Sequence, residues 1–443
     1  MNTNPSQKDY EAFIQEVDKL LTDPVIPIMG YAVSIVQNGR IAFEHANGYR
    51  RFSETDPAAN LPMEVGTRYR IASISKMFVC LSIMQQVEAG RMSLDHDASE
   101  YLGFTLRNPN YPDRIITPRL LMAHYSSVRD GSAYSVPVDV PISECFLPDG
   151  RYYRGGEHYA APENGKDRGP GKYYVYSNLN YGLLGTIVER LSGERFDQYA
   201  RNHVLKPMGI YASYNPSDFN AEEIHNLATI YKRIENGVWA ADKPWTPQED
   251  DYQDKVQNPS KVLISNPDLG TADTEEDITN YQIGTNATIF SPQGGLRISA
   301  HELALFNEMM LAKGVASNGN RIISEESVKE LLTPVWVYDP QLDNIDVSDC
   351  TRCYCAGINM ISPQFGGGYV AKGRKDVSAF GHTGSAYGLI SACYFDPVNA
   401  IGFSYAINGL GADENVYLGE YSNFSIWHER IMTALFNNVF PVD

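Results

Sequence analysis

The chain has 443 residues, of which 43% are hydrophobic and 20% charged, a composition typical of a folded protein with a sizeable core. Its formal net charge of −18 argues against a nucleic-acid partner, because phosphate binding needs clustered lysines and arginines. No apolar run approaches the roughly 18 residues that cross a bilayer, so we expect no membrane span.

The N-terminal residues carry neither the basic nor the apolar region of a secretory signal, which favours a cytoplasmic location. A leader removed ahead of Met1 would instead make the protein periplasmic or secreted. Residues 9–22 follow as a predicted amphipathic helix, because apolar side chains recur on one side. Residues 30–49 then predict a β-hairpin, since two β-rich runs flank Asn38-Gly39, a strong turn signal.

The middle of the chain is predicted to be helical, with long loops between the helices. Apolar residues at helical spacing predict helices over residues 73–90, 179–191 and 301–312. Two long stretches, 126–172 and 211–289, are rich in Tyr, Pro, Gly, Asn and Asp. Loops of this length in a compact domain are usually binding loops or lids, so we expect both stretches to be irregular.

The C-terminal part changes to short apolar strands and a closing helix. The strands are predicted at residues 379–384, 389–395 and 400–407, and the helix at 421–436. These elements predict a mixed α/β (α+β) fold in which both chain ends contribute to one sheet. We expect a single domain over residues 1–443, with a sheet lobe at about 9–72 and 290–443 and a mainly helical lobe at about 73–289.

The six cysteines predict reduced thiols, because disulfides are rare in a large chain without a secretory signal. They are Cys80, Cys145, Cys350, Cys353, Cys355 and Cys393. Cys350, Cys353 and Cys355 form a C-x-x-C-x-C cluster that could bind a metal. Structural zinc sites need four ligands, however, and no fourth ligand is obvious nearby in the sequence. We therefore favour a loop followed by a strand there, and predict no metal and no cofactor.

The first of three candidate motifs is Ser73-Ile74-Ser75-Lys76 at the start of a predicted helix. Residues three apart share a helix face, and the helix N-terminus brings free N–H groups and partial positive charge to the Ser73 oxygen. Desolvation favours a neutral Lys76 amine, which could accept the Ser73 proton. Without other motifs, the pattern would favour a helix-capping serine beside a solvated lysine.

The second and third motifs are Tyr176-Ser177-Asn178 and His382-Thr383-Gly384. A tyrosine before a helix can relay protons, and an asparagine amide both donates and accepts hydrogen bonds; an aromatic cluster and a helix cap are the alternatives. The third motif ends a predicted strand, where Gly384 would let a substrate backbone approach closely. A strand turn with a surface histidine is the alternative there.

The three motifs together, in this order on a helix start, a loop and a strand, resemble the serine β-lactamase and DD-peptidase family. The resemblance covers residues 30–436, and its branch contains class C β-lactamases, DD-carboxypeptidases, D-aminopeptidases and family VIII esterases. It implies a β-lactamase/transpeptidase-like fold with an antiparallel sheet. Supporting runs include TRYRIASISKMF, KYYVYSNLNYG, SPQGGLRISAHEL and FGHTGSAYG.

The resemblance also implies a role for each motif residue. Ser73 would attack a carbonyl and form an acyl-enzyme, with Lys76 or Tyr176 as the base and Tyr176 protonating the leaving group. The backbone N–H groups of Ser73 and Ser385 would form the oxyanion hole. His382 would act with these catalytic residues by hydrogen-bonding Tyr176 or the substrate. Asn178, Thr383 and Gly384 would bind the substrate.

Two departures from the family pattern matter. β-Lactamases of this branch usually carry Lys-Thr-Gly where this chain has His382, so the chain looks more like certain peptidases. Relatives often read Leu-Leu-Thr-His-Thr-Ser-Gly where this chain has residues 120–127, LLMAHYSS, which leaves the shape of that loop open. A substrate carboxylate could bind Thr383 or three basic residues shortly before it: Lys372, Arg374 and Lys375.

Three functions remain open from the sequence. The first is a hydrolase for small esters or for peptides with a D-residue, which makes the expected partner a small molecule or short peptide. The second is an acyltransferase that uses the same acyl-enzyme, and the third is a penicillin-binding sensor or scaffold with little turnover. The sequence gives no indication of oligomeric state.

Overall fold

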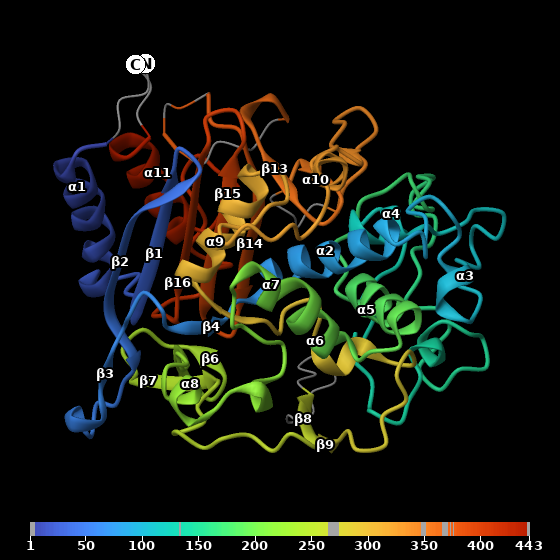
Figure 1. The fold of residues 1–443 in the computed structure, drawn as a ribbon, viewed down its shortest axis with the longest axis horizontal. Coiled ribbons are helices and arrows are strands. Elements are labelled where there is room, and N and C mark those ends of the chain that lie inside the picture. Colours follow the sequence, from blue (N-terminus) through green and yellow to red (C-terminus); the bar gives the residue numbers. More distant parts are fainter. Residues whose placement is uncertain are drawn as a thin grey trace.

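Strands from both ends of the chain form one sheet in the computed structural model, which describes residues 5–132, 134–264, 274–346, 351–365, 371–372, 374 and 376–440. Among these residues, nine strands pair in the order β11-β12-β13-β14-β15-β16-β1-β2-β3. They are β1 (Gly30–Gln37), β2 (Arg40–Arg51), β3 (Leu61–Pro62), β11 (Trp336–Val337), β12 (Cys353–Tyr354), β13 (Asn359–Ile361), β14 (Ala379–Ala386), β15 (Leu389–Asp396) and β16 (Ile401–Ile407). The N-terminal β1 pairs antiparallel with the C-terminal β16, so blue and red strands lie side by side in Figure 1.

Helices cover both faces of this sheet. On one face, α1 (Gln7–Asp18) and α11 (Ile426–Asn438) pack side by side, and on the other lie α9 (Ala300–Leu311) and α2 (Ser75–Glu88) (Figure 1). The alternation of side chains along β1 explains both layers: Tyr31 and Ile35 join the core beneath α1 and α11, whereas Ala32 joins the core beneath α2 and α9.

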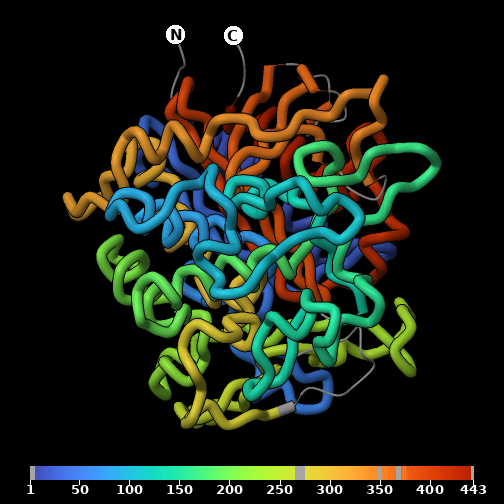
Figure 2. Tube along the Cα trace, turned by 90° about the vertical axis from the view of Figure 1, so that its right-hand side faces the viewer, coloured from blue at the N-terminus to red at the C-terminus, as the bar shows by residue number. Residues whose placement is uncertain are grey.

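A helical lobe with long loops lies beside the α2 side of the sheet. Its helices are α3 (Ser99–Leu102), α4 (Pro118–Met122), α5 (Leu179–Ser192), α6 (Phe196–Tyr199), α7 (Lys206–Met208) and α8 (Ala221–His225); α10 (Glu325–Leu331) packs against α2. Figure 2 looks onto this lobe, with its cyan and green segments in front of the sheet. Because α2 and α5 pack together, and β14 contacts the turn that precedes α2, the segments that carry the first two motifs lie close to the sheet.

The elements expected from apolar spacing are confirmed to within a few residues. The predicted hairpin is β1 and β2, and Asn38 and Gly39 both take positive φ, at 51° and 71°, as a tight hairpin turn requires. The closing helix begins at Ile426 and not at residue 421. The reason is that the backbone N–H groups of residues 420–422 donate to the Glu429 carboxylate, which holds that segment as a loop.

The expectation that residues 211–289 are irregular is wrong in part. This stretch contains α8, β5 (Ile230–Glu235), β6 (Val238–Trp239), β7 (Trp245–Glu249), β8 (Lys261–Ile264) and β9 (Thr274–Asp277). Strand β5 pairs with β7 and also with β17 (Gly409–Leu410), which lies far along the sequence. Because β17 is so distant in the sequence, its pairing with β5 leaves no local sequence pattern. The polar composition of the stretch also gave no indication of strands.

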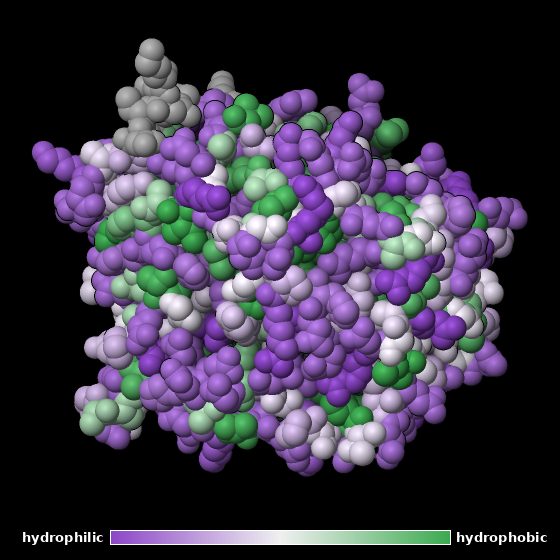
Figure 3. Space-filling model, viewed as in Figure 1, coloured by the Kyte–Doolittle hydropathy of each residue, from purple (hydrophilic) through white to green (hydrophobic). Residues whose placement is uncertain are grey.

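The outer surface agrees with the acidic composition. The face shown in Figure 3 is largely hydrophilic, with apolar side chains in scattered groups. In the described part of the chain, no helix combines the length and the apolar character that crossing a membrane requires.

Candidate functional site

The nucleophile candidate lies on a strained turn between the sheet and α2. Strand β4 (Arg68–Arg70) pairs with β10 (Arg297–Ser299), and the chain then turns through a short 3-10 helix, Ala72–Ile74, into α2. Ala72 has a φ of 54°, a left-handed conformation that non-glycine residues rarely adopt. The Ser75 hydroxyl fixes the turn, because it donates to the Ala72 carbonyl at 2.7 Å and accepts from the Leu296 N–H at 3.1 Å. Ser73 is left partly exposed.

Lys76 is fully buried next to Ser73. Its Nζ lies 3.1 Å from Ser73 Oγ, 2.9 Å from Asn178 Oδ1 and 2.8 Å from the Gln293 carbonyl oxygen. Burial lowers the pKa of Lys76 to about 7, against the opposing effect of the Asp130 charge. The amine can therefore be neutral near pH 7. The Asn178 and Gln293 carbonyl oxygens can only accept hydrogen bonds, so they accept from the two N–H groups of the neutral Lys76 amine. The lone pair of this amine is then free to accept the Ser73 hydroxyl proton.

Asp130 holds Asn178 in place and was not predicted from the sequence. Its carboxylate accepts three hydrogen bonds of 2.9 Å, from Ser177 Oγ, Asn178 Nδ2 and the Leu179 N–H. The bond to Nδ2 fixes the amide so that Oδ1 faces Lys76. Burial raises the pKa of the Asp130 carboxyl, and these donors oppose that shift. An aspartate within a long loop gave no sequence signal of this role.

Tyr176 contacts both the Lys76 amine and the His124 ring. Lys76 Nζ is 4.8 Å from the centre of the Tyr176 ring, and the His124 ring stacks on Tyr176 with ring centres 4.2 Å apart. Burial holds the pKa of His124 well below its usual range, so its ring is neutral, and its Nδ1 accepts from the Ser177 N–H at 3.0 Å. His124 and Asp130 of the 120–130 segment thus hold the second motif in place through contacts with all three of its residues.

That segment has a serine where the family pattern has a glycine. Aligned on His124, the pattern of relatives ends in glycine at the position of Ser127. Ser127 has a φ of 68°, which glycine adopts at little cost and serine only under constraint. Ser127 is buried and its hydroxyl accepts from Asn108 Nδ2 at 3.0 Å, so side-chain bonding stabilises this turn.

His382 lies at the same centre but does not bond to Tyr176. Its ring centre is 6.3 Å from that of Tyr176, and both of its ring nitrogens have other partners. Nδ1 contacts the Thr383 carbonyl and therefore carries the proton, so Nε2 accepts from the Tyr354 hydroxyl at 2.7 Å. Burial, together with the nearby Lys76 charge, lowers the pKa of His382 to about 3. The expected bond to Tyr176 is therefore wrong, and Tyr354 is a neighbour that the sequence did not reveal.

Strand β14 brings the third motif against the nucleophile turn. A side chain at Gly384 would overlap the Ile71 carbonyl and approach Ala72, and Ser391 Oγ on β15 donates to the same carbonyl at 3.0 Å. The close approach at Gly384 is thus made by the chain's own turn and not by a substrate. Neighbouring β13 pairs with β14 only as far as Gly381, so in the described residues the edge beyond it carries no strand on that side.

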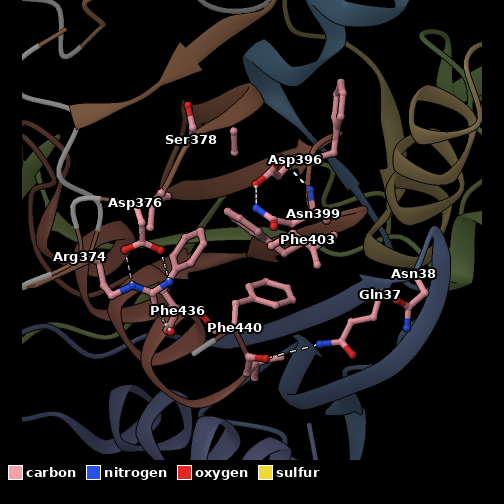
Figure 4. Close-up of a pocket in the computed structure, with 16 residues that line it drawn as sticks. Gln37, Asn38, Arg374, Asp376, Ser378, Asp396, Asn399, Phe403, Phe436 and Phe440 are labelled. Carbon is pink, nitrogen blue, oxygen red and sulfur yellow. Dashed lines mark hydrogen bonds and ion pairs between the residues drawn. The ribbon is translucent and has the colours of Figure 1, made fainter. Parts of the chain in front are cut away.

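Arg374 does not belong to this site. Its guanidinium pairs with Asp376 and donates to the carbonyl oxygens of Phe436 and Phe440 at the end of α11. Figure 4 shows it in a separate pocket lined by phenylalanines at the opposite end of β14. The expectation that Arg374 receives a substrate carboxylate is therefore wrong. Lys372 is exposed, and Lys375 lies outside the described residues.

No metal centre is present among the residues that the structure describes, since nowhere do three His, Cys, Asp or Glu side chains cluster in a way that could hold an ion. Cys353 lies in β12, and it and Cys355 are buried free thiols. Cys350, the remaining member of the cysteine cluster, lies outside the described residues.

Comparison with known sequences finds relatives along most of the chain. A family model described as Beta-lactamase matches residues 17–422. Protein flp of Staphylococcus aureus (strain NCTC 8325 / PS 47) is 25% identical over 244 residues, or 54% of this chain and 45% of that protein. N-acetylmuramyl-L-alanine amidase of Bacillus subtilis (strain 168) is 23% identical over 344 residues, or 74% of this chain and 69% of that protein. The match to flp thus spans about half of that relative's length.

Solved structures share the fold at low sequence identity. A class C beta-lactamase aligns with a TM-score of 0.64 at 13% identity, over 98% of each chain. The D-amino acid amidase of Ochrobactrum anthropi SV3, complexed with D-phenylalanine, aligns with a TM-score of 0.61 at 15% identity, over 98% of this chain and 100% of that one. The octameric penicillin-binding protein homologue of Pyrococcus abyssi gives 0.61 at 21% identity, over 97% and 76%. These alignments confirm the expected β-lactamase/transpeptidase-like fold.

Proposed function

The chain belongs to the beta-lactamase family, and from that premise we propose that it is a serine hydrolase that forms an acyl-enzyme on Ser73. Its substrates would be amides or esters of small molecules or short peptides, and the chemistry requires no cofactor. The observation that carries the proposal is the position of Lys76, whose buried amine lies 3.1 Å from Ser73 Oγ and has a pKa of about 7. A solvated lysine with an ordinary pKa would not serve as a base at neutral pH.

Acylation would begin with proton transfer from Ser73 Oγ to the neutral Lys76 amine. Oγ would form a bond to the substrate carbonyl carbon as the carbonyl electrons move onto oxygen. The backbone N–H groups of Ser73 and Ser385 would then donate to that oxyanion, each contributing about 2.7–4 kcal/mol in the transition state. The open edge of β14 supports this role for Ser385, because a substrate can lie along it.

Collapse of the tetrahedral intermediate would release the amine or alcohol. Tyr176 would pass the proton from Lys76 to that leaving group, a role supported by the proximity of its ring, whose centre lies 4.8 Å from Lys76 Nζ. A water molecule activated by the same pair would then attack the acyl-enzyme. Asn178 and Thr383 would hold the substrate, whereas His382 would position Tyr354 and stay neutral across the working pH range.

Amides are the favoured substrates among the possible classes. Two of the relatives are named as amidases, the enzymes from Bacillus subtilis and Ochrobactrum anthropi. A third motif that carries neutral His382 in place of lysine also provides no cation for a β-lactam carboxylate. We propose that residues 1–443 act as one catalytic domain. The cytoplasmic location stays a prediction.

A panel of p-nitrophenyl esters, D- and L-amino-acid amides and a chromogenic cephalosporin tests the proposal. We expect a burst followed by steady turnover on at least one ester or amide, and loss of turnover by about 10⁴-fold or more in Ser73→Ala. Turnover that rises with an added alcohol or amine would indicate an acyltransferase. A stoichiometric burst without turnover would indicate a sensor, and full activity of Ser73→Ala would exclude this mechanism.

A further inference from the structure

A buried tyrosine on β12 contacts the third motif. Tyr354 pairs with Asn359 on β13, which in turn pairs with Gly381 on β14. This register leaves the tyrosine two strands away from His382, a gap that its long side chain spans. The Tyr354 residue is completely buried, and its hydroxyl donates to His382 Nε2 at 2.7 Å. Because Nδ1 of the same ring contacts the Thr383 carbonyl, both ring nitrogens have partners within the chain.

The same tyrosine also contacts the other histidine of the site. The His124 ring meets the Tyr354 ring edge-on, with ring centres 5.0 Å apart, and stacks on Tyr176 at 4.2 Å. The ring centre of His382 lies 5.9 Å from that of Tyr354 and 6.3 Å from that of Tyr176. Tyr354 therefore contacts both histidines that neighbour Tyr176, the expected proton relay.

A proton on His382 would interfere with the base at Lys76. Burial, and after it the nearby Lys76 charge, lowers the pKa of His382 to about 3, so the two side chains compete for a proton in one buried site. A hydrogen bond donated to the neutral form of a base disfavours its charged form. The Tyr354 hydroxyl occupies the one lone pair of the neutral His382 ring, and it must turn away before Nε2 can take a proton.

The other groups around His382 leave this hydrogen bond in control of its charge. The titratable side chains packed around the ring are Lys76 on α2, His124 and Tyr176 in the lobe loops, Tyr354 on β12 and Cys393, the cross-strand neighbour on β15. Burial holds the pKa of His124 well below its usual range and raises the pKa of Cys393, so both of these are neutral. The Lys76 charge and the Tyr354 hydroxyl then decide whether His382 takes up a proton.

We propose that Tyr354 is a positioning residue whose hydroxyl holds His382 uncharged and in one orientation, so that the Ser73 proton goes to Lys76. The hydrogen bond orients both of its partners, and through the His124 contact the same tyrosine supports the position of Tyr176. This role deepens the proposed function and rests on it, because it concerns the same proton transfer.

A second buried tyrosine–histidine pair offers a matched control. On the face of the sheet that α1 and α11 cover, the Tyr405 hydroxyl on β16 lies 2.6 Å from Nδ1 of His428 on α11. Both residues are buried, and burial lowers the pKa of His428 to about 3, as it does for His382. Tyr405→Phe thus removes the same kind of hydrogen bond at a place away from the catalytic centre.

The test measures turnover of a p-nitrophenyl ester and follows the Cε1–H signal of His382 by NMR, assigned through its loss in His382→Gln. We expect Tyr354→Phe to lower kcat by about tenfold or more and to leave KM within about twofold, since the hydroxyl acts on catalytic groups and not on the substrate. The wild-type His382 signal should keep its neutral position from pH 9 down to pH 5. In Tyr354→Phe it should move toward the protonated position below about pH 6. Tyr405→Phe should keep both the wild-type kcat and the wild-type His382 signal.

The outcomes separate this inference from the function beneath it. If Tyr354→Phe keeps the wild-type kcat, or if its His382 signal stays neutral down to pH 5, the positioning role is wrong while the hydrolase stands. An equal loss of kcat in Tyr405→Phe would also overturn it, because the effect would then be one of general destabilisation. If no ester or amide shows Ser73-dependent turnover, the proposed function itself fails, and the NMR comparison still decides whether Tyr354 holds His382 neutral.

Discussion

At the scale of single residues, Lys76 determines what the site can do. Its three hydrogen-bond partners come from three different segments, because Ser73 precedes α2, Asn178 precedes α5 and Gln293 follows the long loop region. A fully buried ammonium with only neutral acceptors is unfavourable, which is the physical cause of its lowered pKa. The resulting neutral amine is a base aimed at Ser73.

This arrangement predicts an acidic limb in the pH profile. Lys76 must be deprotonated to act, and burial lowers its pKa to about 7, so kcat/KM should rise with pH through about 7 and level off above it. The measurement is kcat/KM for an ester between pH 5 and pH 9 at constant ionic strength. Lys76→Arg keeps the positive charge but cannot lose its proton, so it should lower kcat by about 10²-fold or more. A profile that stays flat down to pH 5 would contradict this role.

At the scale of elements, the site depends on how closely β14 packs against the nucleophile turn. Gly384 has no side chain at the point where Ile71 and Ala72 approach β14, and Ser391 on β15 donates a hydrogen bond to the same turn. This packing sets the distance between the Ser73 hydroxyl and the open strand edge.

Gly384→Ala should therefore disturb catalysis more than folding of the sheet. The added methyl group would overlap the Ile71 carbonyl and move β14 away from Ser73, and a displacement of about 1 Å can cost about 10²-fold in rate. Gly66→Ala is the matched control, because a side chain there meets only Asn226 Nδ2, at 4.0 Å. Steady-state kcat and thermal unfolding of both variants check this; unchanged kcat in Gly384→Ala would show that the contact is not needed.

Sequence patterns predicted the local elements and the three motifs, but not the residues that join them. Apolar spacing placed α2, α5 and α9 well, because packing against the core produces that spacing. Asp130 and Tyr354 were not predicted, because each contacts a site residue that is far away in the sequence. Asp130 bonds to Asn178, and Tyr354 bonds to His382. Such contacts follow from the folded chain and leave no periodic signal.

At the scale of the whole molecule, a buried ion network connects the nucleophile turn to the small sheet of β5 and β7. Arg297 on β10 forms two hydrogen bonds with Asp250, of 3.1 and 2.7 Å, and Arg70 on β4 pairs with Glu249 at the end of β7. All four side chains are buried. Because β4 leads directly into the Ser73 turn, the network fixes the turn relative to β5 and β7.

Asp250→Asn should destabilise the molecule strongly. Among the described residues it leaves Glu249, at 3.7 Å, as the one ion-pair partner of the buried Arg297 charge, and breaking a buried pair in this way costs about 3–5 kcal/mol. Glu325→Gln, which breaks the exposed pair with Lys313, should leave stability unchanged. Urea unfolding of the two variants measures the difference; equal unfolding midpoints would show that the network does not stabilise the fold.

The central claim is that Ser73 becomes acylated, and intact-protein mass spectrometry after acid quenching tests it most directly. Incubation with a p-nitrophenyl ester should add one acyl mass, located by peptide mapping to the segment that contains Ser73, and Ser73→Ala should show no adduct while unfolding at the same temperature. An adduct on another residue, or turnover of the Ser73→Ala variant at the wild-type rate, would contradict the account.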